Sequence, residues 1–400
     1  MSLSATLTLL MIYDFDKEIS RRGTDCVKWD EAEADVLPMW VADMDIETAP
    51  CVQQAILRRA QHGVYGYALV PEGFYDAIIW WNSHRHGWTL RREWILYTSG
   101  VVPAVSAIIK ALCQPGDGVL TFTPAYNCFF SSIRNNGCHL VDFPLTWSPS
   151  EERYSIDFEM LERTLDTERP RLFLLCNPHN PSGRVWTRDE LTRIAILCAS
   201  RGIAVLSDEI HCEFVDPALG RRYLPFAPIA RDAGCQWVIA NAPNKAFNIA
   251  GLQTAYIISP NADIRDRIDR AINDNEVCDI NCFSFLALQA AYTPEGEEWL
   301  NQLVAYIFEN YRYFREHLKA VFPSLPIAHL EGTYLAWVDV SSLIVEPPFS
   351  GSSESLAEHI RQQHRVWVNG GEMYGQAGFI RVNLATQRSR LTEALRRLRV

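Results

Sequence analysis

The segment Val238-Ile-Ala-Asn-Ala-Pro-Asn-Lys-Ala-Phe-Asn-Ile-Ala-Gly251 is an apolar strand-like run that ends in a polar turn carrying Lys245. Two more runs have the same form, namely Leu172-Phe-Leu-Leu-Cys-Asn177 and Ile203-Ala-Val-Leu-Ser-Asp208. Short, continuously apolar runs that alternate with helical segments are typical of a parallel sheet. Because parallel strands present their carboxyl ends at one edge, we expect these three polar ends to converge.

The residues at these strand ends suit one kind of chemistry. Lys245 supplies a primary amine whose pKa burial can lower, as a Schiff base requires. Asp208 supplies a carboxylate that can keep the ring nitrogen of a pyridine cofactor protonated. Asn177 can donate to a phenolic oxygen, and His211 either serves the same oxygen or packs in the core. Together they indicate pyridoxal 5'-phosphate (PLP), an aldehyde that carries such a ring.

The sequence also offers a stacking residue and an anion site for this cofactor. Tyr126 follows an apolar strand-like run and is placed to stack on the ring. The stretch from Glu93 to Leu112 reads as a strand, a glycine turn and a helix. Backbone N–H groups at the start of that helix would bind a phosphate, aided by the helix dipole, and they belong to Gly100, Val101 and Val102.

Each of these residues alone has a simpler interpretation. A lysine after a strand is usually solvated, an Asn-Pro pair is usually a turn, and Asp-Glu before a helix is usually a cap. A metal site is another alternative for Asp208, Glu209, His211 and Glu213, but no Cys-x-x-Cys pair or His-Glu-x-x-His motif accompanies them. The common placement at strand ends favours the cofactor site.

Seven motifs extend the pattern from about residue 12 to residue 400. They are Phe15–Asp30, Leu37–Asp45, Gly63–Tyr67, Cys176–Pro181, Ser207–His211, Glu331–Tyr334 and Arg381–Ala385. With these motifs the chain resembles the fold-type I PLP-dependent enzymes of the class I/II aminotransferase superfamily. Within that superfamily it resembles the cystathionine β-lyase (C–S lyase) branch of the MalY/PatB type.

The resemblance implies an α/β architecture, the fold-type I PLP-dependent transferase fold. A large domain with a mainly parallel sheet flanked by helices would be joined to a smaller α+β domain. We expect the large PLP-binding domain over residues 48–290. The small domain would be built from both termini, over residues 12–47 and 291–400.

The resemblance also assigns roles to the strand-end residues. It makes Lys245 the Schiff-base lysine and pairs Asp208 with the ring nitrogen, while Asn177 contacts the phenolic oxygen and Tyr126 stacks on the ring. Sequence comparison with the family therefore implies the same site as the residues themselves.

Three further residues are assigned to the substrate and the partner subunit. Arg381 matches the arginine that binds the substrate α-carboxylate, for which its planar fork is suited. Trp40 lies in a segment similar to the one that lines the substrate entrance. Tyr67 matches a tyrosine that reaches the cofactor phosphate of the neighbouring subunit, which implies a homodimer with shared sites.

Two positions depart from the family pattern. Aminotransferases usually carry a phosphate-binding arginine eight residues after the lysine, where this chain has Gln253. That arginine is commonly missing in the lyase branch. Asn244 stands where this branch commonly has serine, so an amide replaces one hydroxyl donor to the phosphate.

The implied activity is elimination of a thiol from cystathionine or related cysteine S-conjugates. The products would be pyruvate, ammonia and a thiol such as homocysteine. Two alternatives stay open: an aminotransferase, for aromatic amino acids given the abundant Trp and Tyr, and a PLP-binding regulatory protein with secondary lyase activity. Whether it is a lyase or an aminotransferase, the protein would bind an amino acid as its small-molecule partner.

Composition favours a cytoplasmic enzyme. With 400 residues, 48% of them hydrophobic, the chain can bury a large core. A formal net charge of −11 argues against a nucleic-acid partner, and eleven cysteines without a pairing pattern indicate reduced thiols. The apolar stretch from Leu3 to Ile12 lacks a basic flank and a clear cleavage site, so we expect neither a signal peptide nor a membrane segment. Met11 is an alternative start.

Two helices are predicted, the first from the capping pattern at its start and the second from its apolar face. Thr187-Arg-Asp-Glu190 has the form of a capping box before an apolar-periodic body that runs to Ala199. A long helix is expected after Thr293, with apolar residues at helical spacing from Trp299 to Leu318. This helix would join the two domains.

Overall fold

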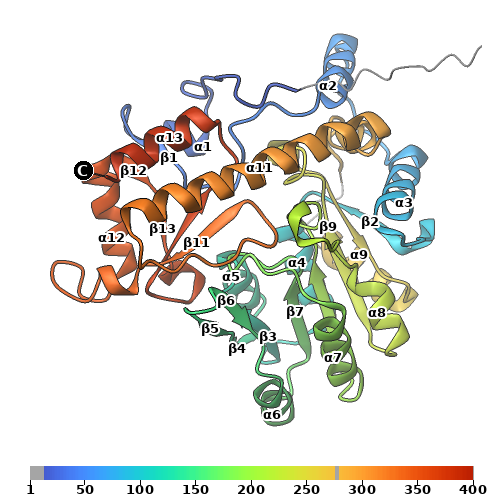
Figure 1. The fold of residues 1–400 in the computed structure, drawn as a ribbon. Helices are drawn as coiled ribbons and strands as arrows, with labels where there is room; N and C mark the ends of the chain where they lie inside the picture. Colours follow the sequence, from blue (N-terminus) through green and yellow to red (C-terminus); the bar gives the residue numbers. More distant parts are fainter. Residues whose placement is uncertain (1–12, 275–278, 400) are drawn as a thin grey trace, which may run out of the picture.

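The computed structural model describes residues 13–274 and 279–399 (Figure 1). The stretch from Leu3 to Ile12, with the alternative start at Met11, lies outside the described residues. Within the described ranges, no helix combines the length and the apolar character that a membrane crossing needs.

A seven-stranded sheet with the order β2-β10-β9-β8-β7-β3-β4 forms the centre of the molecule. Its middle consists of the three strands predicted from the apolar runs, β7 (Leu172–Cys176), β8 (Ala204–Asp208) and β9 (Trp237–Asn241), which pair in parallel. The other strands are β2 (Ile95–Thr98), β3 (Gly118–Thr123), β4 (His139–Pro144) and β10 (Ala255–Ile258). Within this sheet β10 alone runs against its neighbours, so β2 points the same way as β9.

Both faces of the central strands β7, β8 and β9 are buried, which is why these strands are mostly apolar, whereas the edge strand β4 keeps exposed residues. Alternate side chains of β7 separate into two cores: Leu172 and Leu174 pack with the helices of one face, and Phe173 and Leu175 with those of the other. Buried side chains of α4 (Val101–Leu112), α5 (Asn127–Asn135) and α9 (Ala262–Asn273) belong to the first core. Those of α6 (Phe158–Glu168), α7 (Arg188–Ala199) and α8 (Phe226–Asp232) belong to the second.

The capping box predicted before α7 is present. The Thr187 hydroxyl accepts from the Glu190 N–H at 3.2 Å, and the Glu190 carboxylate accepts from the Thr187 N–H at 2.7 Å. Two donors at the helix start are therefore satisfied by local residues, as the sequence pattern indicated.

The long helix α11 (Pro294–Val321) connects the two ends of the molecule (Figure 1). Its predicted apolar face is buried, including Trp299, Leu303, Ile307 and Leu318. One end lies near α2 (Pro50–His62), α3 (Glu72–His86) and α10 (Ser284–Ala291), and the other lies near α13 (Arg388–Arg397).

A second, antiparallel sheet has the order β11-β14-β13, with β11 (Leu335–Asp339), β14 (Phe379–Asn383) and β13 (Asn369–Gly370). Near it lie β1 (Leu37–Pro38), β12 (Val366–Trp367), α1 (Val27–Asp30) and α12 (Ser353–His359). The pairing of β1 with β12 joins the beginning of the chain to its end. Short helical turns complete the architecture: η1 (Arg92–Trp94), η2 (Pro217–Leu219), η3 (Ala250–Leu252), η4 (Ser341–Leu343), η5 (Ile360–His364) and η6 (Glu372–Tyr374).

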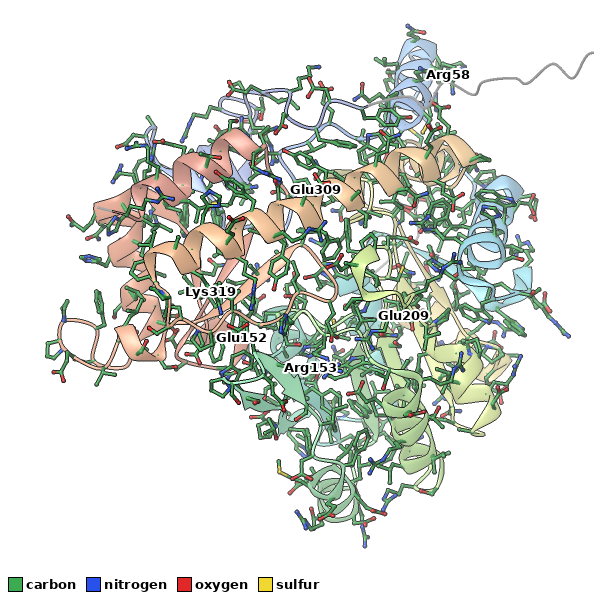
Figure 2. The ribbon with its side chains drawn as sticks, viewed as in Figure 1. Arg58, Glu152, Arg153, Glu209, Glu309 and Lys319 are labelled. Carbon is green, nitrogen blue, oxygen red and sulfur yellow. The ribbon has the colours of Figure 1, made fainter. Side chains whose placement is uncertain are left out.

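Charged side chains tie the hairpin β5 (Thr146–Ser148) and β6 (Arg153–Ser155) to α11. Glu152 at its turn pairs with Arg315 and Lys319, and Figure 2 shows Glu152 and Lys319 close together. The hairpin, which follows β4 of the large sheet, is thereby fixed against the long helix.

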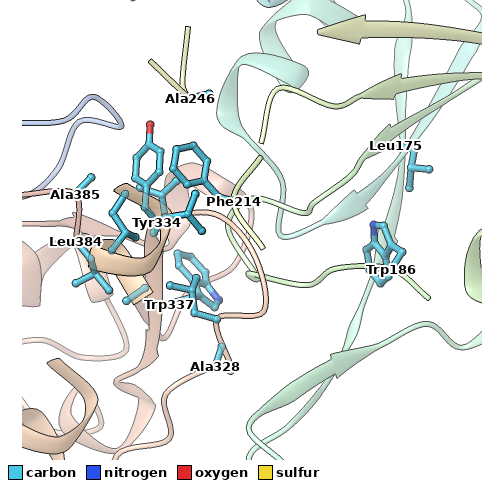
Figure 3. Close-up of a cluster of buried hydrophobic side chains, with 14 of the residues drawn as sticks. Leu175, Trp186, Phe214, Ala246, Ala328, Tyr334, Trp337, Leu384 and Ala385 are labelled. Atoms are coloured by element: carbon cyan, nitrogen blue, oxygen red, sulfur yellow. The ribbon is translucent and has the colours of Figure 1, made fainter. Parts of the chain in front are cut away.

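The loop that leads into β11 docks tightly on the large sheet. A methyl group at Gly332 would lie 2.7 Å from Val185 Cγ2 and 2.9 Å from Phe214 O, so no side chain fits there. Beyond it, the Tyr334 ring packs edge-on against Phe214, with its hydroxyl directed away from Trp337 (Figure 3). The close approach places Tyr334 at the carboxyl edge of the large sheet.

Candidate active site

The three predicted strand ends meet at one edge, as expected. In the sheet register Asp208 lies between Cys176 and Ala240. The Asn177 N–H donates to the Asp208 carbonyl at 2.9 Å, which brings the end of β7 onto the end of β8. Asp208 is the last residue of β8, whereas the sequence placed it just after the strand. The polar turn after β9 carries Lys245 to the same edge.

Lys245 lies where a reactive amine is expected. Its Nζ donates to the Ala42 carbonyl at 2.6 Å. Burial, and then the nearby Arg381 cation, lower the pKa of the amine to about 8, against the attraction of Asp43 and Asp208. An appreciable fraction of this lysine is therefore unprotonated near neutral pH, as nucleophilic attack on an aldehyde requires.

Asp208 is a buried carboxyl group that forms no ion pair with any residue of the ranges that the structure describes. Burial raises its pKa to about 7, although the Ile210 N–H donates to Oδ1 at 3.1 Å and the Lys245 cation favours the ionised form. A cation delivered to this carboxylate would offset its desolvation. The pyridinium nitrogen of PLP is such a cation.

Four residues predicted to contact cofactor or substrate carry buried polar atoms without a hydrogen-bond partner. These atoms are Asn177 Oδ1, His211 Nδ1, Asn244 Oδ1 and Arg381 Nε. Buried polar atoms are rarely left unpaired, and a ligand is one of the usual reasons. Asn177 also donates through Nδ2 to the Leu224 carbonyl at 3.0 Å.

His211 is neutral in this environment. Burial, followed by the Lys245 and Arg381 cations, lowers its pKa well below the usual range. Its ring lies 5.8 Å from the Tyr334 ring, so it both packs in the core and keeps one ring nitrogen free. The two interpretations left open by the sequence are therefore compatible.

Arg381 in β14 has its guanidinium fixed on three sides. Nη1 donates to Asn180 Oδ1 at 3.2 Å, and Nη2 donates to the Trp40 carbonyl at 3.1 Å. The Tyr374 ring lies 4.5 Å from the guanidinium carbon. With Nε unpaired, the fork retains a donor for a carboxylate.

Trp40 contacts this region through its main chain. Its indole stacks on Trp367 at 4.3 Å between ring centres, and its Nε1 donates to the Lys28 carbonyl at 3.4 Å. It is the main-chain carbonyl of Trp40 that accepts a hydrogen bond from Arg381 Nη2. The predicted entrance role of the indole remains a prediction.

The two tyrosines differ in placement. Tyr126 is half-buried beside Phe129, and desolvation of its hydroxyl, then Cys128, raise the pKa of that hydroxyl. The charges of Asp208 and Arg381 also act on it, which places it with the strand-end residues. Tyr67 is 95% exposed and lies outside this chain's own site.

The predicted phosphate site begins at the carboxyl end of β2. Gly100 precedes α4, whose first residues Val101 and Val102 have N–H groups that the helix itself does not use. Gln253 lies after η3, and its amide donates to the Ala250 carbonyl at 3.0 Å, so it turns back on its own loop. It supplies no cation in place of the usual arginine.

The four residues of the metal alternative point to different neighbours. Glu209 accepts from Ser207 and the Phe226 N–H and pairs with Tyr223. Glu213 accepts from Trp81 at 2.7 Å and pairs with Arg85 and His86. Asp208 and His211 instead share the environment of Lys245. The four therefore do not form one ligand set.

Sequence reasoning did not single out several residues of this site. Asn180, Tyr334 and Tyr374 contact it only because the chain folds. Asn180 and Tyr334 do fall inside motifs that carry the family resemblance, which was the available signal. Tyr374 had none.

The chain belongs to the family described as Aminotransferase class I and II, whose model matches residues 34–398. It is 36% identical to the cystathionine β-lyase PatB of Bacillus subtilis (strain 168), over 96% of this chain and 99% of that protein. It is 33% identical to the protein MalY of Escherichia coli (strain K12), over 96% and 97%. The family predicted from the motifs is confirmed.

Solved structures show the same fold. Cystalysin from Treponema denticola, which contains pyridoxal 5'-phosphate, has a TM-score of 0.90 and 31% identity, covering 97% of this chain and 98% of that one. The PLP-bound C–S lyase from Staphylococcus hominis has a TM-score of 0.89 and 31% identity with the same coverage. The predicted fold-type I PLP-dependent transferase fold is thus confirmed.

Proposed function

We propose that this protein is a PLP-dependent C–S β-lyase that acts on cystathionine or related cysteine S-conjugates. The observation that carries the proposal is the largely enclosed Lys245 amine, whose pKa responds to both the Arg381 cation and the Asp208 carboxyl group. The full-length similarity to a cystathionine β-lyase and to two C–S lyase structures supports this choice of reaction.

The residues present fit PLP. Asp208 forms no ion pair in the described ranges, and the α4 N-terminus offers a phosphate N–H groups that the helix does not use. Lys245, Asn177, His211, Asn244 and Tyr126 would hold the remaining groups of the cofactor, with Gly100, Val101 and Val102 at the phosphate. When bound, PLP supplies an electron sink for the charge that develops at the substrate Cα.

The side chains of this chain supply the rest of the chemistry. Arg381 binds and orients the substrate carboxylate, with its guanidinium plane set by Tyr374 and Asn180. Lys245, with a pKa of about 8, accepts the Cα proton at Nζ and can return a proton to the departing sulfur. Loss of the β-thiolate followed by hydrolysis with one water molecule gives pyruvate and ammonia.

The choice of elimination over transamination rests on the phosphate site. An aminotransferase must retain the cofactor while it has no covalent link to the lysine, which a cationic phosphate ligand helps. Here Gln253 is exposed and bonded to its own turn, so this contact is missing. A lyase regenerates its lysine linkage in each cycle and depends less on that cation.

The test is incubation of the PLP-loaded protein with L-cystathionine, with and without 2-oxoglutarate. We expect pyruvate, ammonia and a free thiol at equal rates in both, and no product from Lys245→Ala. Strict dependence on the keto acid, with no thiol released, would overturn the proposal.

An aminotransferase is the second candidate. The family model carries that description, and a PLP-bound putative aminotransferase from Clostridium difficile 630 has a TM-score of 0.91 and 35% identity over 97% of this chain and 99% of that one. The same incubation separates the two activities, because only transamination consumes the keto acid.

The assembly is proposed to be a homodimer in the cytoplasm. The extended segment 63–70 exposes large apolar side chains, with Tyr67 at 95% and Leu69 at 88%. Such a patch is typical of a protein interface. The ten cysteines in the described ranges are unpaired, as in a reducing compartment. The division into domains at residues 47/48 and 290/291 is retained as part of this proposal.

A further inference from the structure

Residues 39–46, here named the strap, cross the site in an irregular conformation. The carbonyl oxygen of every strap residue accepts a hydrogen bond, mostly from side chains far away in the sequence. Asn383, for example, donates to both Val41 O and Asp43 O, and Asn248 donates to both Met44 O and Ile46 O. The strap therefore depends on its carbonyl contacts to stay in place.

One strap carbonyl is shared between the reactive lysine and a second donor. Ala42 O accepts from Lys245 Nζ at 2.6 Å and from the Tyr334 hydroxyl at 2.9 Å. Tyr334 is fully buried and packs against Phe214 and His211, so its hydroxyl has a fixed direction. Burial and then Asp43 raise its pKa, which keeps the hydroxyl protonated and able to donate.

The lysine loses donors to this carbonyl in the course of the proposed function. When the Lys245 ammonium condenses with an aldehyde, a C=N bond replaces the C=O bond, and two of its three protons leave with the aldehyde oxygen as water. At most one N–H then remains on the nitrogen. Ala42 is partly buried, and a carbonyl that is left there without any donor costs free energy, at most roughly 1–3 kcal/mol for a fully buried group.

We propose that Tyr334 is a positioning residue that holds the Ala42 carbonyl, and with it the strap, whenever Lys245 is engaged by the cofactor. The inference rests on the proposed function only for the identity of the group that engages Lys245. In the cofactor-free protein either donor satisfies the carbonyl, and in the loaded protein Lys245 keeps at most one N–H, so Tyr334 is the donor that stays available throughout.

Hydrogen–deuterium exchange of the strap tests whether Lys245 and Tyr334 can each satisfy the Ala42 carbonyl in the absence of the other, which we call the redundancy of the two donors. Its reporters are the amides of Met39, Met44 and Asp45, which donate to Trp367 O, Asn248 Oδ1 and Ala385 O. In cofactor-free protein, we expect Tyr334→Phe and Lys245→Met each to keep wild-type protection. The double variant should exchange faster by about 5- to 100-fold, the ratio that an orphaned carbonyl implies.

Loading with PLP provides the second arm. Wild-type protein should keep its strap protection on loading, whereas Tyr334→Phe should lose it and bind PLP roughly 5- to 100-fold more weakly. Tyr311→Phe is the control, because it removes another buried tyrosine contact to a carbonyl, that of Ala328 at 3.2 Å, together with the bond that the Tyr311 hydroxyl accepts from the Leu330 N–H, and neither bond involves the strap or a lysine. It should leave both readouts unchanged.

The outcomes separate the inference from the proposed function. If Tyr334→Phe alone exchanges as fast as the double variant, Tyr334 is a plain structural anchor and the inference is overturned. Wild-type protection in the double variant overturns it as well. If PLP fails to attach to Lys245, the proposed function fails, while the cofactor-free variants still decide the redundancy.

Discussion

The Nζ atom of Lys245 donates to the carbonyl oxygen of Ala42 at 2.6 Å, across 203 positions in the sequence. Only the folded chain creates this contact, and the enclosed environment around it lowers the pKa of the amine to about 8. Because a lower pKa releases the proton at lower pH, Lys245 should become nucleophilic before an ordinary lysine does.

The first prediction is therefore a reactivity profile. In cofactor-free protein, competitive acylation followed by mass spectrometry should show Lys245 labelling that rises with a midpoint near pH 8. The peptide containing the exposed Lys110 provides an internal reference for the reagent. A midpoint above pH 10 would contradict the assigned environment.

The second prediction concerns Asp208, whose pKa is raised by burial to about 7. The native state then binds a proton that the unfolded state has lost between about pH 4 and pH 7, so this carboxyl destabilises the cofactor-free protein as pH rises through that window. Asp208→Asn should raise the free energy of unfolding at pH 8, by at most about 4 kcal/mol, and have little effect at pH 4.

The same variant should be almost inactive once loaded, because it no longer holds the ring proton. A loss of turnover by orders of magnitude at retained PLP attachment is expected. Denaturant unfolding at pH 8 and pH 4 measures the change in stability, and steady-state turnover measures the loss of activity. Wild-type turnover would show that another group supplies the charge.

The third prediction concerns Arg381. Arg381→Lys keeps the charge but loses the planar fork and its unpaired Nε donor, so apparent substrate affinity should weaken by roughly 1–3 kcal/mol. Initial rates over a range of L-cystathionine concentrations measure this. An unchanged KM with a lowered kcat would instead place Arg381 away from the ground-state carboxylate.

The fourth prediction concerns the partner subunit. Tyr67→Phe should weaken PLP retention, and mixing it with Lys245→Ala protein should restore activity in hybrid dimers, since one site then has both residues. Tyr65→Phe is the control, because its hydroxyl donates within its own chain to Ala60 O at 2.6 Å. A monomer by analytical ultracentrifugation would refute the shared site.

The fifth prediction concerns the docking of the loop before β11. Gly332→Ala places a methyl group 2.7 Å from Val185 Cγ2, so it should lower the free energy of unfolding by about 1–3 kcal/mol. Gly251→Ala, where a methyl group meets nothing within 4 Å, should be nearly neutral. If Gly332→Ala and Gly251→Ala change thermal stability equally, the loop before β11 can move to accommodate the methyl group.

Local pattern was enough to predict much of this fold. The runs 172–176, 203–207 and 238–242 were recognisable as central strands because both faces of a parallel sheet are covered, which demands continuous apolar sequence. The capping box at Thr187 was predictable for a similar reason, since both of its bonds join residues three positions apart. Their polar ends followed from the direction of parallel strands.

The contacts that complete the site depend on packing between distant segments. The hydroxyl of Tyr334 reaches Ala42 from 292 positions away, and the Arg381 guanidinium is held by Asn180 from 201 positions away. No periodicity or spacing records such contacts, because they arise only when segments far apart in the sequence pack together. Residue chemistry and order therefore indicated which groups would act, while tertiary packing decided their burial, their pKa values and the carbonyl that Lys245 and Tyr334 share.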